Sequence, residues 1–135
     1  MKAGRELDAR IETEVFGNEV VERMCLQSYD CGTWEDAEEW YEGKLKEIPE
    51  MRILPCVHDG IEYVPIVHYS TQIADAWLVV EKMWNIGCWR VDIRRMDNGY
   101  LVDLDDMRDT YSASATAAPL AICLAALAVV ERREG

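Results

Sequence analysis

The stretch WRVDIRRMDNGYLVDL, residues 89–104, decides the fold. Two runs rich in β-branched and aromatic residues, 89–96 and 100–104, flank Asp97-Asn98-Gly99. An Asn-Gly step between such runs is a clear signal of a β-hairpin. Residues 110–115, TYSASA, predict a third strand. Together these segments predict an antiparallel β-meander at the centre of the sheet.

Two helices are predicted in the first third of the chain. Residues 5–16 place Leu7, Ile11 and Val15 at helical spacing, and Gly17-Asn18 end the segment. Residues 33–45 predict a second helix, which begins at a Thr33 cap and carries Trp34, Ala37, Tyr41 and Leu45 on one side.

A third helix is predicted from an N-cap at Ser70 or Thr71 to Gly87. Trp77 and Trp84 share one of its faces with Ile73 and Val80, because seven residues make about two helical turns. That face is predicted to pack in the core.

The last helix is predicted to be capped by Thr116, to carry Pro119 in its first turn and to end near Glu131. Its apolar run, 117–130, falls short of the roughly 20 residues that span a bilayer. A helix that is apolar on nearly all sides is buried on more than one side, by the sheet and a neighbouring helix or by a second subunit.

Residues 48–67 predict a loop and a short hairpin, 53–57 with 61–67, joined by a turn at His58-Asp59-Gly60. Prolines at 49, 55 and 65 limit these to edge strands. The complete pattern predicts one α+β domain over residues 1–135, in which four helices cover a three- or four-stranded, mainly antiparallel sheet.

The charge of the chain excludes some partners. It has 14 basic and 26 acidic residues, a net charge of −12, which disfavours binding to long nucleic acids. The sequence opens MKAGRELDARIETEV, too charged for a secretory leader, and its five cysteines form no disulfide framework. We therefore expect reduced thiols, no membrane insertion and a location in the cytosol of the host cell.

Motifs of known enzymes are absent, so we expect a non-enzymatic protein with no cofactor. Cys25, Cys31, Cys56 and His58 include the ligand types that zinc prefers, but their spacing is not that of common zinc sites. Buried thiols are the alternative, and we predict no metal.

One group of residues predicts an anion site. His68, Tyr69, Ser70 and Thr71 precede a helix, whose N-terminal N–H groups suit a phosphate or carboxylate. Arg90 and Arg94 share one face of the next strand and suit the same anion. The alternative is that the hydroxyls only cap the helix and the arginines form surface ion pairs with residues such as Asp92.

Three segments resemble the phage alpha-beta-alpha sandwich domain family: AGRELDARIETEVFG at 3–17, PIVHYSTQIADAWLVVEKM at 65–83 and TAAPLAICLAALAVV at 116–130. The last has one alanine more than the usual Thr-Ala-Pro start, and we assign no resemblance to residues 18–66. The resemblance implies an alpha-beta-alpha sandwich and a viral or prophage origin. It implies no catalytic mechanism.

This origin favours a phage accessory protein that sequesters a small anionic, nucleotide-derived immune signal of the host. The alternative is a module that binds a host or phage protein through its acidic surface, with no small ligand. A homo-oligomer is also expected, from the apolar last helix and the aromatic segment at 33–45.

Overall fold

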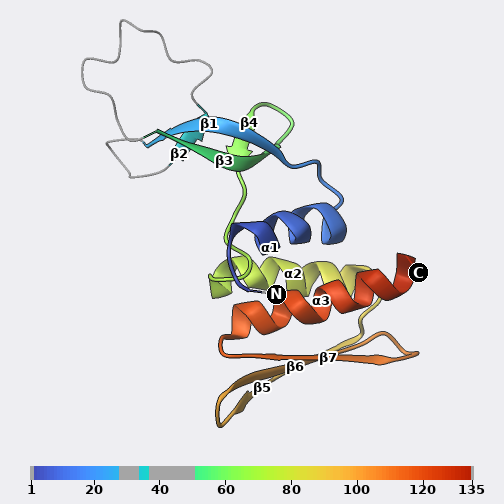
Figure 1. The fold of residues 1–135 in the computed structure, drawn as a ribbon. Helices are drawn as coiled ribbons and strands as arrows, with labels where there is room; N and C mark the ends of the chain where they lie inside the picture. The colour runs from blue at the N-terminus through green and yellow to red at the C-terminus, as the bar shows by residue number, and fades with distance from the viewer. Residues whose placement is uncertain (1, 28–33, 37–50, 135) are drawn as a thin grey trace, which may run out of the picture. The chain divides into compact units, whose positions relative to one another are not determined.

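The computed structural model describes residues 2–27, 34–36 and 51–134 (Figure 1). The contacts divide the chain into unit 1, Met1–Gly17 with Val67–Gly135, and unit 2, Asn18–Ile66. Unit 1 holds the helices α1 (Arg5–Arg10), α2 (Ile73–Asn85) and α3 (Ala118–Glu134), the π-helical turn η1 (Ile11–Val15), and the strands β5 (Arg90–Met96), β6 (Gly99–Asp105) and β7 (Thr110–Ala115). Unit 2 holds β1 (Val21–Gln27), β2 (Trp34–Asp36), β3 (Met51–His58) and β4 (Tyr63–Pro65). The predicted α+β class is confirmed.

The predicted meander is the sheet of unit 1. β5, β6 and β7 pair antiparallel in chain order, with Ile93 opposite Val102 and Met96 opposite Gly99. The loop between β5 and β6 is therefore Asp97-Asn98, and Gly99 opens β6 with a φ of 153°. A Cβ atom at Gly99 would lie 2.3 Å from the carbonyl oxygen of Ala115. Glycine is needed here because β7 approaches the backbone too closely for any side chain.

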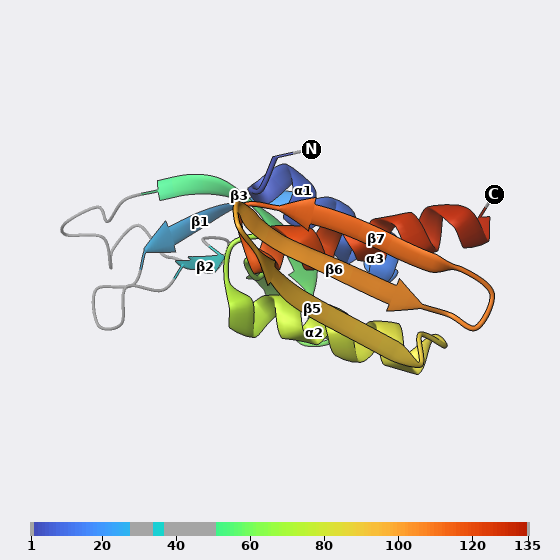
Figure 2. The ribbon, with the colours of Figure 1, turned by 90° about the horizontal axis from the view of Figure 1, so that it is seen from below.

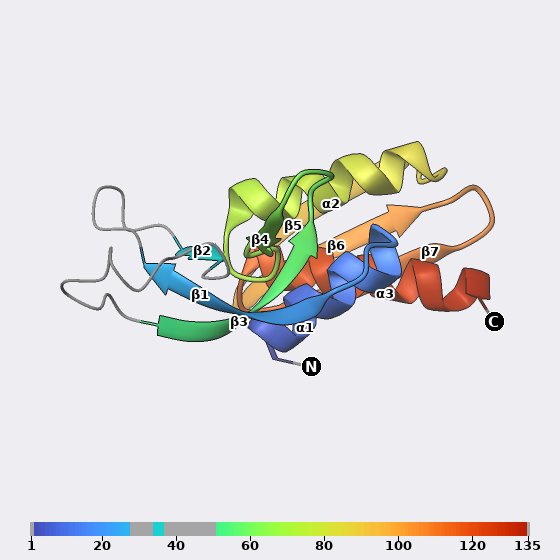
Figure 3. The same cartoon turned by 90° about the horizontal axis from the view of Figure 1, so that it is seen from above.

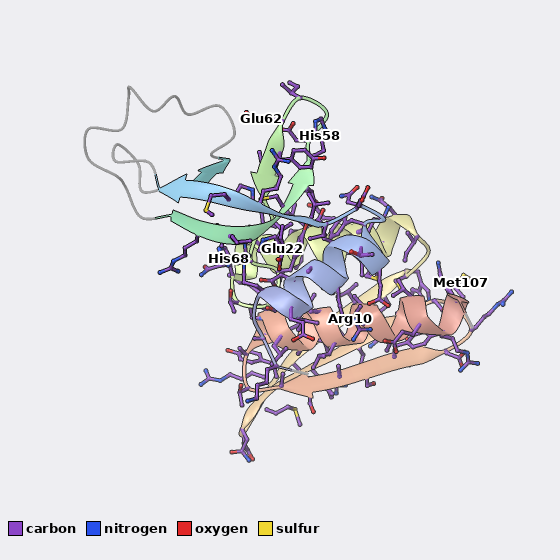
Figure 4. All side chains as sticks on the ribbon, turned by 45° about the horizontal axis from the view of Figure 1, so that its top comes forward. Arg10, Glu22, His58, Glu62, His68 and Met107 are labelled. Atoms are coloured by element: carbon purple, nitrogen blue, oxygen red, sulfur yellow. The ribbon has the colours of Figure 1, made fainter. Side chains whose placement is uncertain are left out.

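The helices of unit 1 cover one face of this sheet (Figure 2). α3 contacts β6, β7 and α2, and α1 lies on the other side of the helices from the sheet (Figure 1). η1 contacts α3 (Figure 3), and Arg10 of α1 forms an ion pair with Glu131 of α3 at 2.9 Å (Figure 4). The predicted burial of α3 on more than one side is thus met by the sheet and by other helices of the same chain.

The first and last helices agree with their predictions, with one local change. The predicted helix 5–16 forms, but its second half is π-helical, and Gly17 ends it with a φ of 74°. α3 runs three residues beyond the predicted end and has Pro119 in its first turn, where the missing N–H costs nothing.

The predicted cap of α2 is wrong, and its predicted core face is wrong for Ile73, Trp77 and Trp84 but right for Val80. Ala76, Val79, Val80 and Met83 are fully buried, whereas Trp77 and Trp84 are 44% and 48% exposed. The N-cap is Gln72, with no side-chain hydrogen bond, because Ser70 is used in another contact described below.

The strands of unit 2 pair antiparallel in the order β2-β1-β3-β4. The predicted helix 33–45 is wrong at 34–36, which form β2, and its remaining residues lie outside the described part of the chain. The predicted hairpin forms, but β3 is not an edge strand, since it pairs with both β1 and β4. Pro55 has no N–H to donate, and its carbonyl oxygen accepts the Ile66 N–H at 3.0 Å, one residue beyond the end of β4.

Candidate functional site

The predicted site begins at the segment before α2, where Tyr69 is buried against α1 and η1. Its side chain stacks on Phe16, with ring centroids 5.2 Å apart, and its hydroxyl donates a hydrogen bond of 2.5 Å to the Glu12 carboxylate. Burial raises the pKa of the Tyr69 phenol, and the Glu12 carboxylate raises it further. Tyr69 therefore remains a hydrogen-bond donor at physiological pH.

Ser70 is also buried and links the same elements. Its N–H donates to Oδ1 of Asp8 at 2.8 Å, and its hydroxyl oxygen accepts the Gly4 N–H at 2.9 Å. Asp8 is fully buried and lies 3.4 Å from the Arg5 guanidinium. Ser70 thus joins the N-terminal segment to the start of α2 rather than facing solvent.

His68 and Thr71 are exposed at the same place. The His68 N–H donates to Oδ2 of Asp75 at 2.9 Å, and its Nδ1 lies 3.2 Å from Nη1 of Arg5 (Figure 4). Two backbone N–H groups before α2 therefore already donate to carboxylates, those of Asp8 and Asp75. A bound anion at this point would meet two negative charges.

Arg90 and Arg94 lie on the other face of the sheet. Val91 and Ile93 alternate with them and pair with Leu104 and Val102, which belong to the core beneath the helices. Since successive side chains of a strand point to opposite faces, the two arginines point away from α2 and α3. Their side chains are 56% and 57% exposed.

Each of these arginines is paired with aspartate. Arg90 lies 2.8 Å from Asp92 and 3.9 Å from Asp105, and Arg94 lies 2.7 Å from Asp103. The Ser112 hydroxyl donates to Asp103, and this hydrogen bond together with the Arg94 guanidinium lowers the pKa of that carboxyl. The Thr110 hydroxyl donates to Asp105 in the same way.

The six predicted residues thus form two separate groups. His68, Tyr69, Ser70 and Thr71 lie beside α1 in the helical part of unit 1, whereas Arg90 and Arg94 lie on the open face of the sheet. The sheet and its covering helices lie between the two groups (Figure 1). A single small ligand does not reach both, and the ligand-binding role of each group stays a prediction.

An open hollow of about 600 Å³ lies at the β5–β6 end of the sheet. It is lined by residues 96–101 and 114–116, which include the carboxylate of Asp97 and the hydroxyls of Ser114 and Thr116. Its lining contains no arginine, lysine or histidine, so its chemistry does not favour an anion.

Cys25 and Cys56, two of the possible zinc ligands, lie in the described part of unit 2. The Cys25 and Cys56 sulfurs lie 3.7 Å apart and are both buried, while Cys31 lies outside the described residues. The Nδ1 atom of His58 accepts the Gly60 N–H at 3.1 Å. Among the residues that the structure describes, no group of three or more His, Cys, Asp or Glu side chains is arranged to hold a metal ion. In α3, burial raises the pKa of the Cys123 thiol to about 12.

The sequence-based site omitted the two residues that organise the segment before α2, Asp8 and Glu12. A signal was present, because Asp8 and Glu12 adjoin Leu7 and Ile11 and so extend the apolar stripe of that helix. Charged residues on the core side of a helix are paired when buried.

None of the helices in the described ranges is both long and apolar enough to cross a membrane.

Comparison with known proteins agrees with this architecture. The profile of the phage ABA sandwich domain family matches residues 15–127. A crystal structure of a phage protein from Bacillus cereus ATCC 14579 is similar with a TM-score of 0.62 and 25% sequence identity, covering 97% of this chain and 89% of that one. Curated proteins give no match. The family match spans most of the sequence, and the chain therefore belongs to the phage ABA sandwich domain family.

Proposed function

We propose that this phage protein is a non-enzymatic protein-interaction module that binds a basic surface of a host or phage protein through unit 2. The distribution of charge carries the proposal. Twelve of the 26 acidic residues but only four of the 14 basic residues lie between Asn18 and Ile66, a net charge of −8. The remaining residues, which are more numerous, carry a net charge of only −4.

Several acidic side chains of unit 2 are exposed. They include Glu22 on β1 and Glu62 before β4 (Figure 4). Asp59, in the turn after β3, accepts the N–H groups of Glu62 and Ile61, and these hydrogen bonds lower the pKa of its carboxyl. Such a surface attracts a cationic partner over a distance of about one Debye length, ~8 Å at physiological salt.

The competing function is sequestration of a small nucleotide-derived anion. One observation favours it, because Arg90 and Arg94 are exposed on the same face of the sheet with the hydroxyls of Thr110 and Ser112. An anion must first displace the aspartates that hold both guanidinium groups. We rank this function second because the chain itself supplies the negative charge that such a ligand would bring.

The test uses the full chain to capture a partner from infected and uninfected host cells. Binding of the purified partner is then measured by calorimetry from ~50 to ~500 mM salt. We expect affinity to fall strongly with salt, and to fall about three- to tenfold at low salt in Glu22→Gln/Glu62→Gln. The control Glu6→Gln/Asp97→Asn removes the same charge from unit 1 and is expected to change affinity less than about twofold.

Two outcomes contradict the proposal. One is a partner whose affinity ignores both salt and the unit 2 substitutions. The other is tight binding of a cyclic dinucleotide or ADP-ribose derivative that Arg94→Ala weakens tenfold or more, about 1.4 kcal/mol per decade. The second outcome would establish the ligand function in place of the protein contact.

A further inference from the structure

Asn98, in the loop between β5 and β6, is followed by Gly99, and this sets it apart from the other asparagines of the chain. Asn18 precedes a glutamate and Asn85 precedes an isoleucine, and in both cases the side chain of the following residue shields its backbone nitrogen. Glycine has no Cβ atom, so residue 99 does not cover its own nitrogen. The side-chain carbonyl carbon of Asn98, Cγ, is therefore the one most open to attack by the next backbone nitrogen.

The structure leaves the side chain of Asn98 free to turn. Asn98 is exposed and lines the open hollow at the β5–β6 end of the sheet together with Gly99, so water reaches both residues. In the part of the chain that the structure describes, its amide group makes no hydrogen bond. The contrasting case is Asp59, which also precedes a glycine but whose Oδ1 atom accepts two backbone N–H groups, each at 2.8 Å. A side chain held in that way is kept from the following nitrogen, whereas that of Asn98 can approach it.

The fold itself requires the glycine that makes this step reactive. A side chain at residue 99 would shield the backbone nitrogen, but its Cβ atom would lie 2.3 Å from the carbonyl oxygen of Ala115. The φ of 153° at Gly99 is also one that other residues rarely adopt. The pairing of β6 with β7 therefore keeps an exposed Asn-Gly step at the end of the hairpin.

We propose that Asn98 is a site of spontaneous deamidation, in which water converts the asparagine to aspartate and isoaspartate. The backbone nitrogen of Gly99 loses its proton to hydroxide and forms a bond to Cγ of Asn98, and the bond from Cγ to the side-chain nitrogen breaks and releases ammonia. Water then opens the resulting five-membered imide. Attack at Cγ gives aspartate, and attack at the backbone carbonyl carbon gives isoaspartate. The sum is asparagine and water to a carboxylate and ammonium, with no oxidant or reductant.

The two products differ in their effect on the hairpin. Aspartate leaves the backbone unchanged and adds one negative charge to the net charge of −12. Isoaspartate also directs the main chain through the former side chain, which adds one carbon atom to a loop whose flanking residues, Met96 and Gly99, pair with each other. Because loop length fixes the register of a hairpin, the isoaspartate form is expected to lose pairing at this end of β5 and β6. The reaction takes place in unit 1 and is independent of the protein contact proposed for unit 2.

The test is incubation of the folded full chain at neutral and at mildly alkaline pH, followed by mass spectrometry of its peptides. Each conversion adds about 1 Da, because a side-chain NH₂ group becomes OH, and in water labelled with heavy oxygen the new oxygen atom carries the label. Asn98 is expected to convert at least about tenfold faster than Asn18 or Asn85, which corresponds to ~1.4 kcal/mol of activation free energy. The rate is expected to rise with pH, since hydroxide removes the Gly99 proton, and both aspartate and isoaspartate forms of the peptide are expected.

Two variants serve as controls, and circular dichroism checks that each is folded. Asn98→Gln keeps an amide but would have to form a six-membered ring, and it is expected to abolish the conversion at this position. Asn98→Asp adds the charge without lengthening the main chain, so it is expected to unfold at the same urea concentration as the wild type, whereas the purified isoaspartate form is expected to unfold at a lower one. The proposal is overturned if Asn98 converts no faster than Asn18 and Asn85, or if its rate does not change with pH. A product that is aspartate alone also overturns it, because direct hydrolysis of the amide gives no isoaspartate.

Discussion

Replacing Tyr69 by phenylalanine removes one oxygen atom and keeps the ring that stacks on Phe16. The lost hydroxyl donates a 2.5 Å hydrogen bond to Glu12, which is 5% exposed. A hydrogen bond to a charged group contributes ~1.5–3 kcal/mol, and the buried carboxylate regains little from water. We expect Tyr69→Phe to lower the free energy of unfolding by about 2 kcal/mol.

Urea unfolding followed by the helical circular dichroism signal measures this loss. The helices of the described residues lie in unit 1, so the signal reports the unit that holds Tyr69. With a slope of ~1–3 kcal/mol/M, the midpoint is expected to fall by about 1 M without a change of slope. Tyr63→Phe, at a half-buried tyrosine of unit 2, is the control and is expected to change stability by less than ~0.5 kcal/mol.

Stability measured at alkaline pH is a second test of the hydrogen bond between Tyr69 and Glu12. Burial first, and Glu12 second, raise the pKa of Tyr69 above its usual 10.0. A raised pKa in the folded state contributes stability that is complete below the unfolded pKa and is lost as pH rises above it. The difference in the free energy of unfolding between wild type and Tyr69→Phe is therefore expected to become smaller above about pH 10. A loss below ~0.5 kcal/mol at neutral pH would refute the reasoning, because the hydroxyl would then have equal partners in water.

Three further predictions test the sheet and its turns. Gly99→Ala is expected to lower the free energy of unfolding by more than ~2 kcal/mol, because its Cβ would meet the Ala115 carbonyl oxygen. Thermal unfolding measures this loss, and a smaller loss would mean that β7 can move away from the new side chain. Ser112→Ala is expected to raise the pKa of Asp103 toward its usual 3.8, seen by carboxyl NMR titration. A carboxyl pKa that is lowered in the folded state contributes stability above the usual value of 3.8, and this contribution is lost as pH falls. The free energies of unfolding of wild type and variant should therefore converge in acid, and an Asp103 pKa that does not change in Ser112→Ala would contradict this. Met107→Gly is expected to raise the free energy of unfolding by ~0.5–1 kcal/mol, because Met107 has a φ of 75°, which glycine adopts without strain. Its side chain is 86% exposed (Figure 4), and destabilisation would show that it makes a stabilising contact.

The parts of the fold predicted correctly are those with strong local signals. The hairpin around Asp97-Asn98, the third strand and α3 depend on turn residues, β-branched runs and a first-turn proline, which act within a few residues. Residues 34–36 were mispredicted because acidic residues after Thr33 suit a helix start, whereas pairing with β1 made them a strand. Such pairing depends on a neighbouring strand and overrides the preference of the segment itself.

The candidate site was less predictable, since the chemical type of a residue does not show which face of the fold its side chain joins. The alternation in 89–96 correctly placed Arg90 and Arg94 together, on the side opposite Val91 and Ile93. It left open which side faces the helices. Ser70 suited an N-cap by type, but its position beside the buried Asp8 gave it a different role.

The sequence by itself therefore determined the meander, the helices at both ends, the acidic character and the family. Only the tertiary structure decided which face of α2 is buried, because both faces are apolar at helical spacing. The small and medium side chains Ala76, Val79 and Val80 allow α2 to lie close to α3, whereas Trp77 and Trp84 would hold the helices apart. The fit between α2 and α3, and not the hydrophobicity of the side chains alone, therefore decides which face of α2 is buried. The tryptophans are left on the outside.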